Sequence, residues 1–563
     1  MAITTPKKPS RGEFPLLTQA HHEVAFCAPL WEFRADRAAM PLSALCWNGG
    51  VAAVAVEPYS QSEAGTIRNG VFAALPDAFG VSLGYTNDPV TFKNRSTAAP
   101  STRNMACKAQ TSGTIYLRHG PRTELHEIIR QEYARHQDRA VPRNTLRQAV
   151  QGMLDTFAYQ NFDAAAGEYT NRCCRPPRET EMRPWRLVTE IGWTGGGVLA
   201  YPLVLCRDAL GADAEAPLAA AMSGEQLFDR IADAYNENSG LLNDLMVPNA
   251  AGSQVNGWWT GYGLVKDCHC AYTVGSAVHY LTKTMDYLHQ NGKPCPAKWM
   301  DAAQKVLHTV MDLQRADGAF GYTYSTQERK VLDWSGFAGC WFAPALVYLY
   351  RLTGEERCLH SAEKALDYYH TFVKDLNCYG TPMDTWKAVD EEGNLAFMRG
   401  SRLLYEQTGK AEFLQYMKDS AGYEFLWRYG YKTYPEHTPL NQGWSACGGA
   451  VTSVSNPHIH PMGVIIDTDL RYLARVTGDG YYASRAADSA AWMLQCLELY
   501  PAATGYGRYG ILSERWCPSD GLDVERFSDG RPFSSWFSHN LWASACVLEA
   551  ACELLLEIEH KKG

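Results

Sequence analysis

The chain has 563 residues, more than one hydrophobic core usually supports, so its length favours two domains. Its residues are 46% apolar and 20% charged, which indicates a globular protein and excludes a disordered one. The formal net charge of −9 argues against a nucleic-acid partner or an anionic membrane surface. No run of residues is long and apolar enough to span a bilayer, so we expect no membrane partner.

The first fifteen residues, MAITTPKKPSRGEFP, contain basic residues but no apolar segment of the kind that signal peptides carry. The sequence holds 17 cysteines, too dispersed in so long a chain to form a disulfide framework. Many of them lie inside apolar helical runs, where cysteine behaves as a small buried hydrophobic residue in a reducing compartment. We therefore expect a cytoplasmic protein.

The N-terminal part of the chain reads as β structure. Between about His21 and Arg118, short segments rich in Val, Phe, Tyr and Thr alternate with Gly, Pro, Asn and Asp, a pattern typical of antiparallel strands. We predict strands at 23–33, 51–57, 81–85, 90–92 and 113–117. The prediction is a β-sandwich-like domain over residues 1–120, followed by a linker over 121–141 that contains a helix at 124–138.

The remainder, residues 142–563, is predicted to be helical. Apolar residues recur at intervals of three and four in twelve segments. Short turns with glycine alternate with long loops, and each long loop precedes an apolar helix that reads as buried on all sides. The predicted helices are 142–160, 194–210, 223–237, 270–290, 297–315, 337–352, 355–374, 391–408, 410–430, 461–476, 480–499 and 536–559.

Three of the short turns are close copies of one another: YLYRLTGEERCL, LLYEQTGKAEFL and YLARVTGDGYYA. An internal repeat of helical pairs indicates either a closed ring or a solenoid. Every long loop enters an apolar helix from the same side, so six repeats favour a ring of inner helices. All six long loops would then lie on one rim.

A β-sandwich, a linker helix and six helical hairpins with Thr-Gly turns resemble the six-hairpin glycosidase superfamily, the (α/α)6 toroids. The resemblance covers residues 142–563 and, more weakly, the β domain. It implies that the chain binds carbohydrate at the rim and acts as a glycoside hydrolase, a polysaccharide lyase or a sugar epimerase. A fold shared by several activities does not select one of them.

The predicted rim is rich in aromatic residues. Sugar rings present flat C–H faces that stack on aromatic planes while their hydroxyl groups reach polar side chains. The alternative is that large loops build small aromatic cores of their own. We predict substrate contacts from Trp193, Trp258, Trp259, Tyr322, Trp334, Trp386, Trp444 and Trp536.

Acidic residues stand just before the inner helices: Glu190, Asp267, Asp333 and Asp384. Glycoside hydrolysis needs a protonated acid at the leaving oxygen and a carboxylate that activates water or attacks carbon, and the resemblance implies the inverting plan. We predict Asp333 as general acid and Asp384 as base, with Asp267 and Glu190 as substitutes. The alternative for each is a helix N-cap.

Histidines also occupy the predicted rim. His458 and His460 stand between two prolines, which favour an extended segment and related ring directions. They suit proton transfer as well as contacts to sugar hydroxyls, and His269 and His539 occupy comparable places in other repeats. Structural histidines bonded to backbone carbonyls are the alternative. This histidine-rich rim keeps lyase and epimerase activities open, with Tyr322 as a further proton-transfer group.

No metal or cofactor is expected. Cys268-His269-Cys270 and Cys173-Cys174 lack the paired spacing of zinc sites, and no phosphate-binding or dinucleotide motif is present. The favoured interpretation is a glycoside hydrolase acting on an oligosaccharide or glycoside by carboxylate acid/base catalysis. A lyase or sugar epimerase is the alternative within enzymes, and a non-catalytic carbohydrate-binding toroid is the alternative outside them.

Overall fold

The computed structural model describes two compact units. Unit 1 comprises residues 1–141, 424–460 and 515–536, and unit 2 comprises residues 142–423, 461–514 and 537–563. The described residues are 31–47, 49–62, 65–68, 71–74, 79–82, 114–163, 168–169, 172–173, 183–184, 189–192, 196–211, 215–246, 257–260, 263–381, 387, 389–433, 444–453, 456–497, 499, 510, 512–516, 535–536, 538–539 and 541–560.

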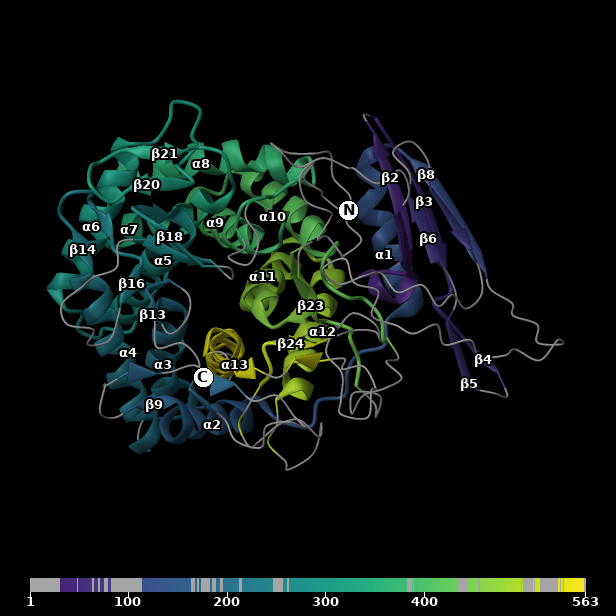
Figure 1. Ribbon diagram of the computed structural model, residues 1–563, viewed down its shortest axis with the longest axis horizontal. Coiled ribbons are helices and arrows are strands. Elements are labelled where there is room, and N and C mark those ends of the chain that lie inside the picture. The colour runs from purple at the N-terminus through teal and green to yellow at the C-terminus, as the bar shows by residue number, and fades with distance from the viewer. Residues whose placement is uncertain are drawn as a thin grey trace. The chain divides into compact units, whose positions relative to one another are not determined.

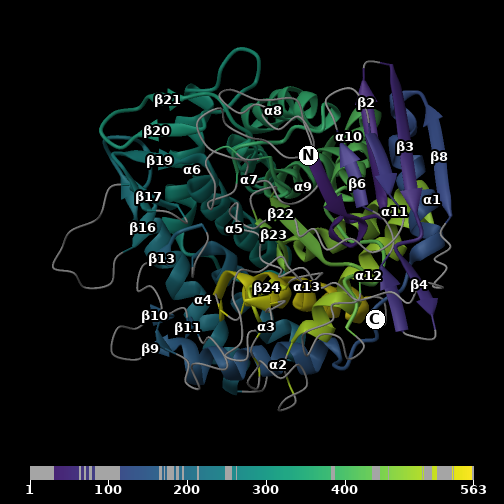
Figure 2. The same ribbon diagram turned by 45° about the vertical axis from the view of Figure 1, so that its right-hand side comes forward.

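Unit 1 contains small antiparallel sheets. The first has the order β1-β6-β7, the second β2-β3-β8, and β4 and β5 form a separate hairpin. In both views β2, β3 and β8 lie side by side (Figure 1 and Figure 2). The strands are β1 Trp31–Arg34, β2 Leu42–Trp47, β3 Gly50–Val56, β4 Tyr59–Ser62, β5 Gly65–Arg68, β6 Val71–Ala74, β7 Phe79–Ser82 and β8 Ile115–Gly120.

Side chains from both three-stranded sheets meet in one buried cluster. Val54 and Val56 of β3 pack with Phe72 of β6, and Val81 of β7 lies against them. The predicted strands at 51–57 and 113–117 correspond to β3 and β8, and the predicted strand at 90–92 lies outside the described residues. The full β-sandwich therefore stays a prediction. The linker helix is found as α1, Leu125–His136.

Unit 1 also takes in segments from later in the chain. A four-stranded sheet has the order β22-β23-β24-β25, from Ala450–Ser453, Asn456–His460, Arg515–Trp516 and Ser535–Trp536. The hydroxyl of Tyr431 donates to the carbonyl oxygens of Ala35 at 2.8 Å and Ala38 at 3.0 Å. Unit 1 is thus built from three separate parts of the sequence.

Unit 2 is a ring of paired helices. Each inner helix packs against the next, and the last inner helix packs against the first, so the ring closes. The inner helices are α3 Gly197–Leu210, α5 Ala271–Gln290, α7 Phe342–Thr353, α9 Glu392–Thr408, α11 Asp467–Thr477 with the preceding 3-10 turn η6 Met462–Ile466, and α13 Leu541–His560 (Figure 1). The outer helices are α2 Leu146–Thr156, α4 Glu215–Asp233, α6 Ala297–Asp312, α8 Glu356–Lys374, α10 Ala411–Glu424 and α12 Gly480–Cys496.

All twelve predicted helices are present, with ends that differ by up to about eight residues. The outer helix α2, the first of the ring in sequence, packs against α13, the last. The sixth hairpin therefore joins distant parts of the chain. This closure explains why only five short turns link an inner helix to the outer helix that follows it.

The repeated Thr-Gly turns share one geometry. The glycines Gly354, Gly409 and Gly478 have φ values of +73°, +65° and +71°, the left-handed conformation that ends a helix at least cost for glycine. The preceding threonine hydroxyl donates to the carbonyl oxygen four residues earlier, at 2.6–2.8 Å. The same oxygen accepts the backbone N–H two residues later. Threonine therefore caps the inner helix and shapes the turn.

Candidate active site at the N-terminal ends of the inner helices

A three-stranded sheet joins the loops that precede α5 and α7. It has the order β19-β20-β21, from Cys268–Cys270, Thr323–Ser325 and Val331–Asp333. His269 pairs with Tyr324, and Thr323 pairs with Asp333. The backbone N–H of Tyr322 donates to the carbonyl oxygen of Asp333 at 2.7 Å. Residues from two rim loops are thereby held in one framework.

Asp333 is fixed as an anion in this framework. Lys387 Nζ lies 2.6 Å from Asp333 Oδ2 and 4.9 Å from the centre of the Tyr322 ring. The backbone N–H and the hydroxyl of Ser335 donate to Asp333 Oδ1 at 2.8 and 2.7 Å. Burial opposes ionisation, but the hydrogen bonds from Lys387 and Ser335 outweigh it and the pKa of Asp333 lies below its usual value. This setting suits a permanent carboxylate and does not favour the predicted role of proton donor.

Three consecutive acidic residues open the inner helix α9. Asp390, Glu391 and Glu392 are all buried. Asp390 accepts backbone N–H groups from Thr381 and Gly393 at 3.0 and 3.1 Å. It therefore shapes the helix entry, and the positive end of the helix dipole favours all three carboxylates.

Glu391 and Glu392 lie near groups of other inner helices. Glu392 is hydrogen-bonded to the hydroxyl of Tyr272, in the first turn of α5. Both glutamates act on the Cys546 thiol of α13, whose pKa is raised first by burial and then by neighbouring carboxylates. Glu392 therefore acts on groups of both α5 and α13, which lie on different sides of α9 around the ring, and Glu391 acts on α13.

Tyr272 is held in its neutral form. Burial, followed by the charge of Glu392, raises the pKa of Tyr272 well above its usual value. The hydroxyl consequently remains a hydrogen-bond and proton donor at neutral pH. A donor and a buried carboxylate thus stand together at the N-terminal ends of two inner helices, where the sequence predicts the active site.

His269 links two loops of unit 2 through buried hydrogen bonds. Its ring is fully buried, with Nδ1 2.7 Å from Asp244 Oδ2 and Nε2 2.9 Å from Ser239 Oγ. Asp244 also accepts the backbone N–H of Cys270 at 3.0 Å, and burial raises the pKa of Asp244 despite the nearby imidazole. Both ring nitrogens are occupied within the protein. This arrangement does not fit the predicted contact of His269 with substrate and instead joins the loop after α4 to the loop before α5.

His458 and His460 belong to unit 1. They lie two residues apart in β23, so the strand carries both on one face, and both are buried. The Nδ1 atom of His460 lies 2.9 Å from the carbonyl oxygen of His458. This contact is the backbone-bonded arrangement that the structural alternative predicts.

The described aromatic residues are largely committed to contacts within the protein. Trp444 is buried and stacks on Trp516, with ring centres 6.2 Å apart and planes 16° apart, as the small-core alternative predicts. The Arg315 guanidinium lies 5.1 Å from the Trp334 ring centre, and Tyr322 is buried. Asp267 is exposed at a turn with φ of +60° between β18 Gly263–Lys266 and β19.

For several residues of the predicted site, the structure describes no side chain. Trp193, Asp384 and Trp386 lie outside the described residues. For Glu190, Trp258, Trp259, Trp536 and His539 only the backbone is described, in β13 Thr189–Glu190, β17 Gly257–Thr260, β25 Ser535–Trp536 and β26 Ser538–His539. Their predicted roles stay predictions.

The sequence analysis missed Glu391, Glu392 and Tyr272. The run Asp390-Glu391-Glu392 stands directly at the start of the predicted helix 391–408, so the rule that selected Asp333 and Asp384 applies to it equally. Because the predicted helix began at Glu391, these acids were assigned to the helix and not to the rim. The acidic first turn of this predicted inner helix was the sequence signal that could have identified Glu391 and Glu392.

The described part of the chain contains neither a metal-binding cluster nor a helix suited to cross a membrane. Within it, no three His, Cys, Asp or Glu side chains gather in a group suited to a metal ion. None of its helices combines the length and the apolar composition that a membrane crossing requires.

No protein-family model matches the chain, and no curated protein matches it. It is similar to a glycoside hydrolase family 76 mannosidase from Bacteroides thetaiotaomicron, 13% identical over 74% of this chain and 99% of that one, with a TM-score of 0.47. It is similar to the cellobiose 2-epimerase from Spirochaeta thermophila, 13% identical over 78% and 99%, with the same TM-score. A D-mannose isomerase is 10% identical over 73% and 97%, also at 0.47. Likenesses this distant do not decide an activity.

Proposed function

We propose that this protein is a carbohydrate-active enzyme whose catalytic centre lies at the N-terminal ends of α5 and α9. The observation that carries the proposal is the pair of buried glutamates, Glu391 and Glu392, at the start of an inner helix and near the Cys546 thiol of another inner helix, α13. Tyr272 supplies a hydrogen bond to one of them. Glycoside hydrolysis needs one carboxyl group that donates a proton and one carboxylate that activates water.

The proposed division of roles follows from the environment. Two carboxyl groups that share a buried site do not ionise independently, so one of them tends to hold a proton. Glu392, hydrogen-bonded to a neutral tyrosine, is assigned as the carboxylate, and Glu391 as the proton donor. Asp333, held as an anion by Lys387, is assigned to substrate orientation at the rim, a role that needs a permanent charge.

Sugar epimerisation is the second candidate. The Tyr272–Glu392 pair favours it, because a carboxylate beside a hydroxyl donor can remove a proton from carbon and return one. Products distinguish the two activities. Hydrolysis releases new reducing ends, epimerisation conserves mass and the number of reducing ends, and a lyase product absorbs in the ultraviolet through its new double bond.

The described thiols support a reducing compartment. Cys206 and Cys552 lie with their sulfur atoms 3.8 Å apart in the core of unit 2 and are not bridged. Paired buried thiols of this kind are typical of intracellular proteins. We therefore propose a cytoplasmic enzyme that acts on oligosaccharides or small glycosides.

The test compares conservative variants on a panel of aryl glycosides and oligosaccharides. Glu391→Gln and Glu392→Gln should each lower kcat by roughly 10²- to 10⁴-fold, the usual contribution of a general acid or base, while substrate binding persists. Glu412→Gln, on the exposed face of outer helix α10, is the matched control and should retain full activity. If both rim variants keep parental turnover, the proposed centre is wrong. If the parent binds sugar but forms no product, the protein is a non-catalytic toroid.

A further inference from the structure

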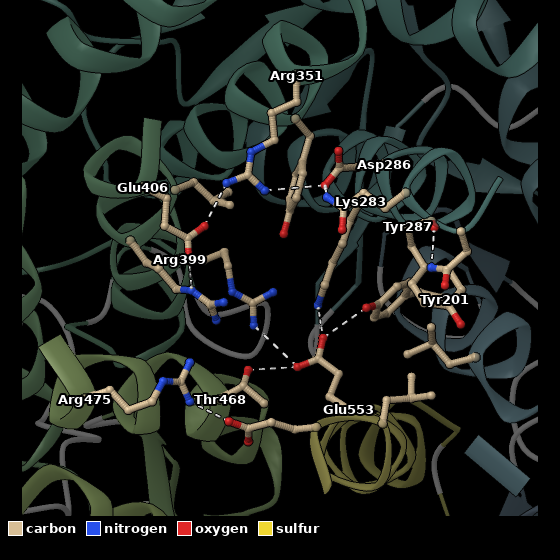
Figure 3. Close-up of a pocket in the computed structure, with 18 residues that line it drawn as sticks. Tyr201, Lys283, Asp286, Tyr287, Arg351, Arg399, Glu406, Thr468, Arg475 and Glu553 are labelled. Atoms are coloured by element: carbon tan, nitrogen blue, oxygen red, sulfur yellow. Dashed lines mark hydrogen bonds and ion pairs between the residues drawn. The ribbon is translucent and has the colours of Figure 1, made fainter. Parts of the chain in front are cut away.

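A cavity lies at the C-terminal ends of the inner helices, opposite the ends that carry the candidate active site. It has a volume of about 310 Å³ and takes lining residues from all six inner helices of unit 2, mostly from their C-terminal halves (Figure 3). The candidate active site uses the N-terminal ends of these helices. The cavity is therefore a separate feature that the proposed catalytic groups do not line.

The floor of the cavity is an ionic network. Lys283 Nζ lies 2.7 Å from Glu553 Oε1 and 2.5 Å from Glu549 Oε1. Glu553 also accepts hydrogen bonds from the hydroxyls of Tyr201 at 3.0 Å and Thr468 at 2.9 Å (Figure 3). Arg399 binds Asp469 at 2.7 Å on the neighbouring side. These groups are almost entirely buried, so the floor is rigidly organised.

The walls of the cavity also consist of ion pairs, which become more exposed toward solvent. Arg351 lies 2.7 Å from Glu406 and 3.5 Å from Asp286, and Arg402 lies 2.9 Å from the same Glu406 (Figure 3). At the mouth, Arg475 pairs with Glu557 at 2.5 Å and is half exposed. Burial thus decreases from the floor to the mouth, so the cavity opens to solvent.

Positive and negative charges nearly cancel within the cavity. Five lining cations stand against four lining carboxylates, and Asp469 and Glu549 lie behind the floor. Every lining cation forms an ion pair with a carboxylate of the described residues. A charged ligand would have to displace one of these partners. A neutral ligand rich in hydroxyl groups can donate to the carboxylates and accept from the guanidinium groups while the ion pairs persist.

Tyrosines complete the lining. Tyr348 lies among Arg351, Arg399 and Lys283, and its hydroxyl makes no hydrogen bond within the described part of the chain. Tyrosine rings offer a flat apolar surface beside these polar groups, a combination that matches the C–H faces and hydroxyls of a sugar ring. The volume lies at the lower end of the range for ligand pockets, which favours one or two rings.

We propose that this cavity is a second ligand site, which binds a neutral mono- or disaccharide at the C-terminal ends of the inner helices. The inference does not depend on the chemistry proposed at the N-terminal ends, because no residue is shared. A site of this kind would report sugar concentration to the ring that carries the catalytic groups.

The test measures binding calorimetrically on the whole chain carrying Glu391→Gln, with D-glucose, D-mannose, cellobiose and maltose as neutral probes and D-glucuronate and inorganic phosphate as charged probes. At least one neutral probe should bind. Adding Leu556→Trp, which fills the cavity from a half-buried lining position, should weaken that binding at least 10-fold. Tyr348→Phe, which removes only a hydroxyl, is the second variant if Leu556→Trp does not fold, and should weaken binding several-fold.

Three results would overturn the proposal: no neutral probe binds, a charged probe binds more tightly than any neutral one, or binding is unchanged in both cavity variants. Sugar binding by the Glu391→Gln chain that neither cavity variant weakens would assign the ligand to the N-terminal site. Loss of turnover in Glu391→Gln without sugar binding at the cavity would overturn this inference and leave the proposed function standing. Retained turnover in Glu391→Gln with sugar binding at the cavity would do the opposite.

Discussion

Replacing Lys283 by methionine tests the buried ionic network directly. The substitution conserves much of the side-chain length but removes the ammonium group that lies within 2.7 Å of both Glu549 and Glu553. Burial opposes ionisation of Glu553, but Lys283, followed by Arg399, lowers the pKa of Glu553 from 4.5 to about 2. Burial has the larger effect on Glu549, whose pKa is raised. The lysine therefore holds one carboxylate ionised in a site that disfavours charge.

The magnitude follows from this shift. At 1.36 kcal/mol per pKa unit, lowering a pKa from 4.5 to about 2 corresponds to roughly 3 kcal/mol. Removing one partner of a buried ion pair usually costs about 3–5 kcal/mol, which agrees. We expect Lys283→Met to lower the free energy of unfolding by about 3 kcal/mol at pH 8.

The sign of the pH dependence gives a second readout. In the parent, the stability that comes from the depressed pKa of Glu553 is fully present above pH 4.5 and is lost as the pH falls toward 2. In the variant, one carboxyl group takes up a proton to avoid buried repulsion. The difference between variant and parent should therefore be smaller at pH 5 than at pH 8.

Urea unfolding of unit 2, followed by tryptophan fluorescence at both pH values, measures these differences. Lys410→Met is the matched control, because Lys410 makes an exposed ion pair with Glu363 and such pairs contribute little. Equal stability of Lys283→Met and parent at pH 8, or the same loss at pH 5 and pH 8, would refute the reasoning. Adding Glu553→Gln to Lys283→Met should restore part of the lost free energy of unfolding, because it removes the buried carboxylate that no longer has its lysine partner.

Three further predictions concern other parts of unit 2. Gly354→Ala, at φ of +73°, should destabilise the chain by about 1 kcal/mol in thermal or urea unfolding. Gly480→Ala is the control and should not destabilise it, because the added methyl group meets no atom within 4 Å. Equal effects of the two substitutions would contradict the left-handed cap at Gly354. Ser239→Ala should cost about 1–3 kcal/mol by leaving His269 Nε2 without its partner, and unchanged stability would show that the tie is not needed. Lys387→Met should raise the pKa of Asp333, so that the acid limb of the pH–rate profile moves to higher pH; an unmoved limb would separate Asp333 from turnover.

The helical ring was predictable from the sequence because its signals are local. An apolar helix, a Thr-Gly turn and an amphipathic helix recur, and the threonine and glycine of each turn act on their own helix end. The pairing of α2 with α13 has no local signal, because it joins segments nearly four hundred residues apart in sequence only through the closure of the ring. Unit 1 was harder for the same reason, since its four-stranded sheet combines segments from either side of α11 and α12.

The candidate site was only partly predictable. The position before an inner helix drew attention to Asp333, but the role proposed for Asp333 depends on Lys387, which lies 54 residues away in sequence. His269 appeared to be a rim group because its partners Asp244 and Ser239 lie in the preceding loop and give no sequence signal. Glu391 and Glu392 were within reach of the same positional rule and were missed because the helix boundary was placed just before them.

The closure of the ring through α2 and α13 bears on how the protein is made. During synthesis, α2 emerges first among the twelve helices of the ring, and the helix that covers it emerges last. Its apolar residues Val150, Met153 and Leu154 are buried in the finished fold, and the most extensive packing partner of α2 is missing until α13 leaves the ribosome. The ring therefore cannot complete its core one hairpin at a time. Nascent chains expose apolar surface on α2, which favours aggregation, until α13 has been synthesised. We expect release of this protein from chaperones to coincide with the emergence of α13.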